Sequence, residues 1–166
     1  MNEAVYNKIG SWFLKHRAAF VCLRFCGEIL PFLIAAGYFI LLFFLFITVG
    51  VFDKVFLKVL LIPAGVFVLV TLLRAVLNFK RPYEQLNISP LVRKDTTGKS
   101  FPSRHTASVF VIASAFFYIN PILGAAAAMC GVFIAASRVL YGVHYIKDVV
   151  CAALIGIAAI VMFYIP

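Results

Sequence analysis

The residues that could do chemistry in this chain lie in three short stretches. These stretches are Arg74–Pro82, Pro102–His105 and Ser137–Asp148. In the third stretch His144 precedes Asp148 by four residues, so helical structure from His144 onward would place both side chains on one face, one turn apart. A carboxylate in that position can orient a nucleophilic histidine and stabilise its positive charge. The spacing therefore indicates a nucleophile and its orienting partner.

Three arginines and a second histidine accompany this pair. Arg74, Arg81 and Arg138 carry forked guanidinium donors, which suit the oxygens of a phosphate group. His105 supplies a second imidazole that can exchange protons near neutral pH. Two histidines together with three arginines indicate phosphoryl transfer.

The order and spacing of these residues resemble a known family signature. Arg74 is followed after six residues by Arg81-Pro82, then Pro-Ser-x-His occupies residues 102–105, and Ser-Arg-x5-His-x3-Asp occupies residues 137–148. This pattern resembles the three-part signature of the type-2 phosphatidate phosphatase superfamily, integral-membrane lipid phosphatases related to vanadium haloperoxidases. The resemblance covers roughly residues 74–148 and the helices that carry them.

The resemblance implies a role for each matching residue. His144 would attack phosphorus and form a phosphohistidine, Asp148 would hold its imidazole, and His105 would protonate the leaving oxygen and later activate water. The phosphoryl oxygens would be held by three arginines and a hydroxyl, which are Arg74, Arg81, Arg138 and Ser103. Arg104 and Ser137 are two further candidates. No metal or other cofactor is expected, because only Asp148 of the six carboxylates lies in the signature.

Two positions depart from the family pattern. Arg74 stands where the family usually has Lys, which keeps the charge but alters reach and fork geometry. Arg104 stands where the family usually has Gly, so a bulky cation lies beside the site. It can add a phosphate ligand or narrow the access, and the sequence leaves both interpretations open.

The composition is that of a membrane protein. Of 166 residues 64% are hydrophobic and 13% are charged, and the mean hydropathy is +1.07. Residues 108–136 carry no charge and are interrupted at Asn120-Pro121, which predicts a helical hairpin. We expect an all-α, polytopic bundle with five transmembrane helices at about 29–51, 57–77, 103–119, 121–139 and 147–165.

The N-terminal segment predicts an interfacial helix. Its apolar residues fall on one helical face and Lys8 and Lys15 on another, the apolar set being Val5, Ile9, Trp12 and Phe13. A frayed basic tail is the alternative, and a cleavable signal is not expected because the first long apolar run begins only at Ile29. We expect one domain over residues 1–166, with the interfacial helix at 1–25 and the transmembrane core at 29–165.

Pro102-Ser103 predicts the start of the third crossing, with Ser103 as its N-cap. A helix start also presents free N–H groups and the positive end of a dipole, and His105 would lie in its first turn. Capping alone would explain Ser103, but capping and phosphate binding are compatible.

The remaining cations and the cysteines indicate no further ligand. The net charge is +9, and the basic residues occupy loops and helix ends, where they meet anionic headgroups and phosphates rather than nucleic acid. For Arg93, Lys94 and Lys99 a solvated loop surface is an equally good interpretation. Gly98-Lys99-Ser100 resembles the end of a P-loop, but Arg93 occupies a position where that motif needs Gly. The four cysteines complete no zinc set and are assigned to packing.

The expected substrate is a lipid phosphate or diphosphate reached from the bilayer of the cell membrane. The small chain resembles bacterial members that act on undecaprenyl diphosphate, and phosphatidate or phosphatidylglycerophosphate is the alternative. A non-catalytic binding or transport protein that kept the phosphate pocket is a third hypothesis, against which the intact His, His and Asp argue. The sequence does not indicate the oligomeric state.

The two indications of sidedness disagree. Five crossings place the three motifs and the N-terminus on one side, and the excess of N-terminal cations over Lys54 and Lys58 favours a cytoplasmic site. Enzymes of the resembled kind that recycle diphosphate carriers usually face outward. We therefore predict an extracytoplasmic active site.

Overall fold

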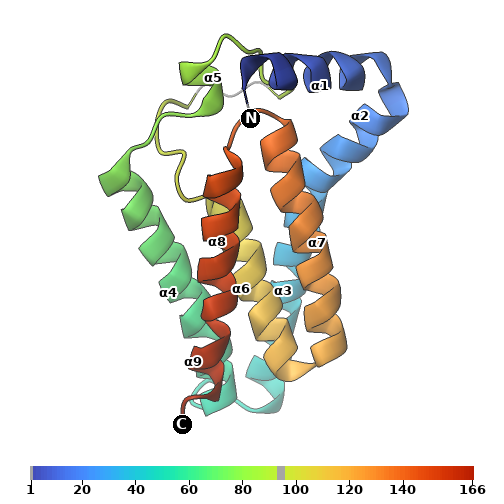
Figure 1. The fold of residues 1–166 in the computed structure, drawn as a ribbon. Coiled ribbons are helices and arrows are strands. Elements are labelled where there is room, and N and C mark those ends of the chain that lie inside the picture. Colours follow the sequence, from blue (N-terminus) through green and yellow to red (C-terminus); the bar gives the residue numbers. More distant parts are fainter. Residues whose placement is uncertain (1, 93–95) are drawn as a thin grey trace.

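The structure, a computed structural model, describes residues 2–92 and 96–166, and within them all regular structure is helical. Figure 1 shows upright helices side by side, with α1 lying across one end of the bundle. In chain order the helices are α1 (Glu3–Lys15), α2 (Arg17–Arg24), the π-helical segment η1 (Phe25–Ile29), α3 (Leu30–Thr48), α4 (Lys54–Leu77), α5 (Pro82–Gln85), α6 (Arg104–Ile119), α7 (Pro121–Leu140), α8 (Ile146–Ala158) and α9 (Ile160–Tyr164).

The five predicted crossings are all present as helices. Four helical runs are long and apolar enough to cross a membrane, and they are Arg17–Thr48, Lys54–Gln85, Pro121–Leu140 and Ile146–Tyr164. The fifth, Arg104–Ile119, has 16 residues and is shorter. The predicted all-α, polytopic bundle is therefore confirmed.

The short helix α6 forms the centre of the bundle. It packs against α3, α4, α7, α8 and α9, and most of its residues from Thr106 to Ala115 are buried. Gly156 of α8 allows close approach, because a Cβ there would lie 2.7 Å from Phe110 Cβ and 2.9 Å from Ala107 O. Ser114 Oγ donates to Gly156 O at 3.2 Å. This contact fixes the helix that carries His105 against the helix that carries Asp148.

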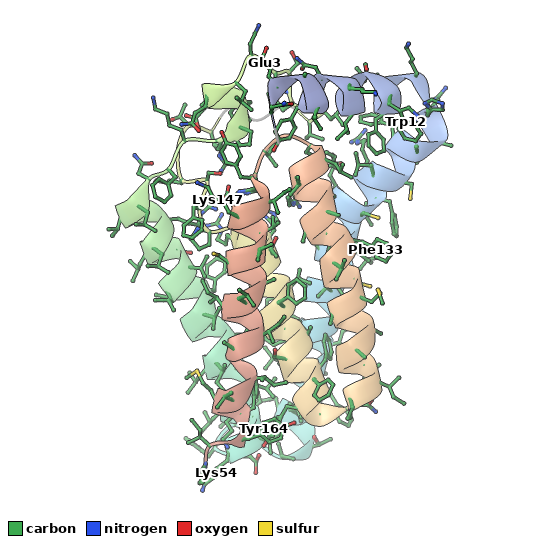
Figure 2. All side chains as sticks on the ribbon, in the orientation of Figure 1. Glu3, Trp12, Lys54, Phe133, Lys147 and Tyr164 are labelled. Atoms are coloured by element: carbon green, nitrogen blue, oxygen red, sulfur yellow. The ribbon has the colours of Figure 1, made fainter. Side chains whose placement is uncertain are left out.

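The two ends of the bundle differ in chemistry. Helices α1 and α5 lie at one end and the C-terminus at the other (Figure 1). Figure 2 places Glu3 and Trp12 at the first end and Lys54 and Tyr164 at the second. At the second end Lys58 Nζ donates to the carbonyls of Phe163 and Ile165, at 3.1 and 2.5 Å. These hydrogen bonds join α4 to the end of α9, and the described residues at this end include none of the signature residues.

The N-terminal segment forms two helices that meet at His16. Helix α1 leaves Val5 41% and Trp12 49% exposed, whereas Tyr6 is buried. Phe13 packs on a small hydrophobic cluster formed by Leu23, Tyr141 and Val143. The predicted interfacial helix is therefore present at residues 3–15. Residues 17–25 differ from the predicted interfacial segment at 1–25, because they run without a break into α3 as part of the first membrane span.

Candidate active site

The turn between α7 and α8 places His144 and Asp148 together. Helix α7 ends in a Schellman motif, in which Gly142 has φ +73° and donates to Val139 O at 2.9 Å. Val143 N and His144 N both donate to Arg138 O at 3.3 Å, which closes the turn. Glycine adopts this left-handed conformation without the strain that a side chain would add, so Gly142 favours the turn that positions His144.

Helix α8 begins at Ile146, close to the predicted start at 147, and does not extend back to His144. His144 therefore precedes the helix, which corrects the expectation that both residues share a helical face. Asp148 occupies the third helical position, and its Oδ2 accepts from Tyr145 N at 3.0 Å. The distance from His144 Nδ1 to Asp148 Oδ2 is 3.5 Å, and both side chains are buried. The expected pair forms because Asp148 caps the helix and turns back toward His144.

Ser100 completes this pair and was missed by the sequence analysis. Its hydroxyl donates to Asp148 Oδ2 at 2.5 Å and lies 3.5 Å from His144 Nδ1. The side chain is fully buried, and Ser100 N donates to Phe79 O at 2.8 Å. Ser100 thus fixes the carboxylate that orients the imidazole. No helical spacing relates position 100 to position 148, so only its place just before Pro102-Ser103 could have suggested it.

The surroundings of His144 favour its neutral form. Burial lowers the pKa of its imidazole, and the charges of Arg81 and Arg74 lower it further, against the opposing effect of Asp148. With Nδ1 turned toward the carboxylate, Nε2 is the ring nitrogen left for the cavity that His144 lines. A neutral imidazole held in this way is suited to nucleophilic attack.

A cavity of about 540 Å³ lies in front of this histidine. It collects six of the side chains that the sequence marked as candidates, although they come from separate parts of the chain. Its walls include Arg74, Arg81, Arg104, His105, Arg138 and His144. Such a concentration of guanidinium groups beside two imidazoles suits a phosphate-sized anion.

Backbone carbonyls hold three of the arginines in place. Arg81 Nε donates to Gly98 O at 3.0 Å, Arg74 Nη1 donates to Pro102 O at 2.8 Å, and Arg138 Nη2 donates to Gly27 O. A guanidinium has five N–H donors. The described carbonyls use only one or two of them on each arginine, so donors that face the cavity can bind phosphoryl oxygens, whereas Arg138 Nε is buried without a described partner.

Ser103 and Ser137 do not line the cavity. Ser103 occupies the predicted N-cap position of α6, but its side chain makes no capping hydrogen bond and instead accepts from Thr106 Oγ1 at 3.1 Å. Its backbone N donates to Asp148 O at 3.0 Å. Ser137 Oγ donates to Ile134 O at 2.7 Å. Both hydroxyls therefore bond within the protein and do not face the cavity, and the backbone of Ser103 joins the start of α6 to α8.

The loop after α5 supplies a wall that the sequence analysis did not assign. Thr96, Thr97, Gly98 and Lys99 all line the cavity. Gly98 has φ +62°, and its N donates to both oxygens of Glu84, at 3.0 and 2.9 Å. Lys99, for which a solvated surface was an equal alternative, thus borders the site while staying exposed. Arg93 and Lys94 lie outside the described residues.

The fold and the site together define a multi-pass membrane protein with an arginine-lined, histidine-bearing pocket at one end of its bundle. The model of the PAP2 superfamily matches residues 55–165, a range that contains all three signature stretches. The chain belongs to this superfamily, and the resemblance inferred from the motifs is confirmed. No curated protein sequence matches the chain significantly.

Two solved structures are similar over most of their length. The crystal structure of Aquifex aeolicus LpxE is 25% identical with a TM-score of 0.62, covering 87% of this chain and 93% of that one. The crystal structure of the first transmembrane PAP2-type phosphatidylglycerolphosphate phosphatase from Bacillus subtilis is 22% identical with a TM-score of 0.57, covering 96% and 83% respectively. The second likeness supports the fold alone.

Proposed function

We propose that this protein is a membrane lipid phosphatase that hydrolyses a lipid phosphate or diphosphate through a phosphohistidine intermediate. The observation that carries the proposal is the buried His144–Asp148 pair at the wall of an arginine-lined cavity. His144 Nε2 attacks phosphorus while the bond to the leaving oxygen breaks, and Asp148 stabilises the imidazolium that forms. Arg74, Arg81 and Arg138 stabilise the charge on the phosphoryl oxygens.

His105 acts as the proton donor and then as the base. It lies in the first turn of α6 and lines the cavity that His144 also lines. In the first step it protonates the leaving oxygen. In the second it takes a proton from water, which attacks the phosphohistidine and restores His144.

A lipid substrate is supported by a second hollow of about 600 Å³ between α3, α4 and α6. Its lining is largely apolar, but Arg104 and His105 belong to both this groove and the cavity. A headgroup in the cavity would therefore have its hydrocarbon chain in the groove. Among lipid substrates we propose undecaprenyl diphosphate first, with phosphatidate and phosphatidylglycerophosphate as the alternatives.

A single-turnover assay on purified protein in detergent micelles tests the proposal. A panel of these lipids carrying labelled phosphate should give inorganic phosphate and an acid-labile, alkali-stable phosphoprotein. Binding of every lipid without phosphate release would instead favour the non-catalytic binding or transport protein.

We further propose that hydrolysis needs no metal ion. Within the part of the chain that the structure describes, no group of three or more His, Cys, Asp or Glu side chains could hold one. Arginines would then neutralise the phosphate. Turnover should survive excess EDTA, whereas complete loss that a divalent cation restores would contradict this proposal.

The extracytoplasmic orientation of the site also stays a proposal. A cysteine probe at position 95, in the loop between α5 and α6, would test this orientation, but that position lies outside the described residues. Ser89 in the same loop is exposed and takes its place. In a variant whose four native cysteines are replaced by alanine, Ser89→Cys should react with a membrane-impermeant reagent in intact cells and Lys54→Cys should not. The reverse pattern would turn the site inward and favour phospholipid intermediates made on the cytoplasmic face.

A further inference from the structure

Arg104 differs from the other arginines of the site in how it is held. Its guanidinium lies over the ring of Phe67, 5.4 Å from the centroid, and the side chain is exposed. Among the described residues it makes no hydrogen bond or ion pair, whereas Arg74, Arg81 and Arg138 each donate to a backbone carbonyl. Phe67 positions the cation without using its N–H donors, so all five remain for a ligand.

Arg104 also occupies a special position between the two hollows. It lines the arginine-rich cavity on one side and the apolar groove on the other, together with His105. In a bound lipid, the atoms next to this boundary join the attacked phosphorus to the hydrocarbon chain. In an in-line displacement these atoms belong to the leaving group.

The chemistry at this boundary differs between the two classes of substrate. In a lipid diphosphate the bond from His144 Nε2 to the terminal phosphorus forms while the bond to the bridging oxygen breaks. The bridging oxygen keeps the electron pair and leaves as part of a lipid monophosphate, whose phosphate must lie at the boundary. In a lipid monophosphate the leaving oxygen is attached to carbon, and no second phosphate is present there.

We propose that Arg104 binds the phosphate that remains with the lipid, and that it thereby makes the site selective for lipid diphosphates. This inference rests on the proposed phosphatase function and specifies its substrate class. A bidentate guanidinium contact would hold the second phosphate and stabilise the charge that develops on it as the bridging bond breaks.

The test compares farnesyl diphosphate with farnesyl monophosphate, because the two share one hydrocarbon chain. We expect Arg104→Gly to lower kcat/KM for the diphosphate by about 10- to 100-fold and to change that for the monophosphate by less than about 3-fold. Arg104→Lys should fall between, since an ammonium keeps the charge but loses the fork. Lys147→Gly is the matched control, because Lys147 is an exposed cation in the first turn of α8 that lines neither hollow.

The outcomes separate this inference from the function on which it rests. Equal losses on both substrates, or a larger loss on the monophosphate, would overturn the role of Arg104 while leaving the phosphatase intact. Absence of hydrolysis of any lipid by the unaltered protein would refute the function itself. Lys147→Gly should leave the ratio of kcat/KM for the diphosphate to that for the monophosphate unchanged. A change as large as that in Arg104→Gly would contradict the inference, because the ratio would then depend on positive charge near the site and not on a contact from Arg104.

Discussion

Two pairs of ionisable side chains in this chain have the same spacing of four residues but different surroundings. Arg24 and Glu28 approach to 2.9 Å with side chains 55% and 37% exposed, whereas His144 and Asp148 are 3.5 Å apart with side chains 5% and 1% exposed. The shorter contact is the weaker candidate for function, because exposed pairs contribute little. Burial removes water from the second pair and, together with the charges of Arg81 and Arg74, lowers the pKa of His144. Spacing therefore identifies a pair, and its surroundings decide what the pair can do.

The two carboxylates of these pairs lie in different places in the fold. Glu28 lies in the π-helical segment η1 on the outer surface, one residue after Gly27. Asp148 instead accepts from Ser100 Oγ and Tyr145 N, which fix its orientation. Tyr6 OH, from α1, lies 3.5 Å from His144 O. The buried pair is thus held by its own turn and by two distant parts of the chain, so changes to it should affect turnover far more than changes to the exposed pair.

The largest effect should come from removing the nucleophile. We expect His144→Ala to lower turnover by about 10⁵-fold or more, because no phosphohistidine can form. Asp148→Asn should lose less, about 10³- to 10⁴-fold, since the imidazole remains but is no longer oriented and charge-stabilised. Phosphate release in single turnover measures both. Near-normal hydrolysis by His144→Ala would refute the assignment of the nucleophile.

Ser100 tests whether the support of the buried pair matters in addition to the pair itself. Ser100→Ala removes the hydroxyl that donates to Asp148 Oδ2 and should lower kcat by about 10-fold, because the carboxylate is then less firmly oriented. Ser100→Thr restores a hydroxyl and should recover part of the rate if the pocket admits the extra methyl. Ser114→Ala is the control for helix packing, because its buried hydroxyl joins α6 to α8 and does not line the cavity. Equal losses in Ser100→Ala and Ser114→Ala would assign Ser100 to packing alone.

How much of this site was predictable follows from how each residue is positioned. The apolar runs and the Asn120-Pro121 break predicted the crossings, and Asn120 does cap α7 by accepting from Ile122 N at 2.9 Å. His144 and Asp148 were found because they lie close in sequence. Ser100 and Thr97 were missed because they reach the site through an irregular loop, whose path depends on contacts such as Gly98 with Glu84. Residues brought together by such long-range contacts have no periodic signal.

The pKa of the His144 imidazole is a measurable property in which the buried pair should show the effect of its surroundings. Burial lowers the pKa of its imidazole below the ordinary value of 6.5. The neutral nucleophile is therefore present above that lowered pKa and is lost only as the pH falls through it. Ring nitrogen chemical shifts of labelled protein in micelles, followed against pH, report this step. A midpoint at or above 6.5 would mean that Asp148 outweighs burial and the two nearby arginines.

The smallest effect is expected at the exposed pair. Arg24→Ala removes the contact with Glu28 and should leave the free energy of unfolding almost unchanged, because solvent screens the pair and the side chains gain freedom when it breaks. Turnover should stay within about 2-fold of the unaltered protein, since neither residue lines the cavity. Denaturant unfolding in micelles gives the first quantity and single-turnover phosphate release the second. A fall in turnover of 10-fold or more would show that the η1 segment helps to position Arg138, whose Nη2 donates to Gly27 O. In that case exposure would no longer distinguish the two pairs.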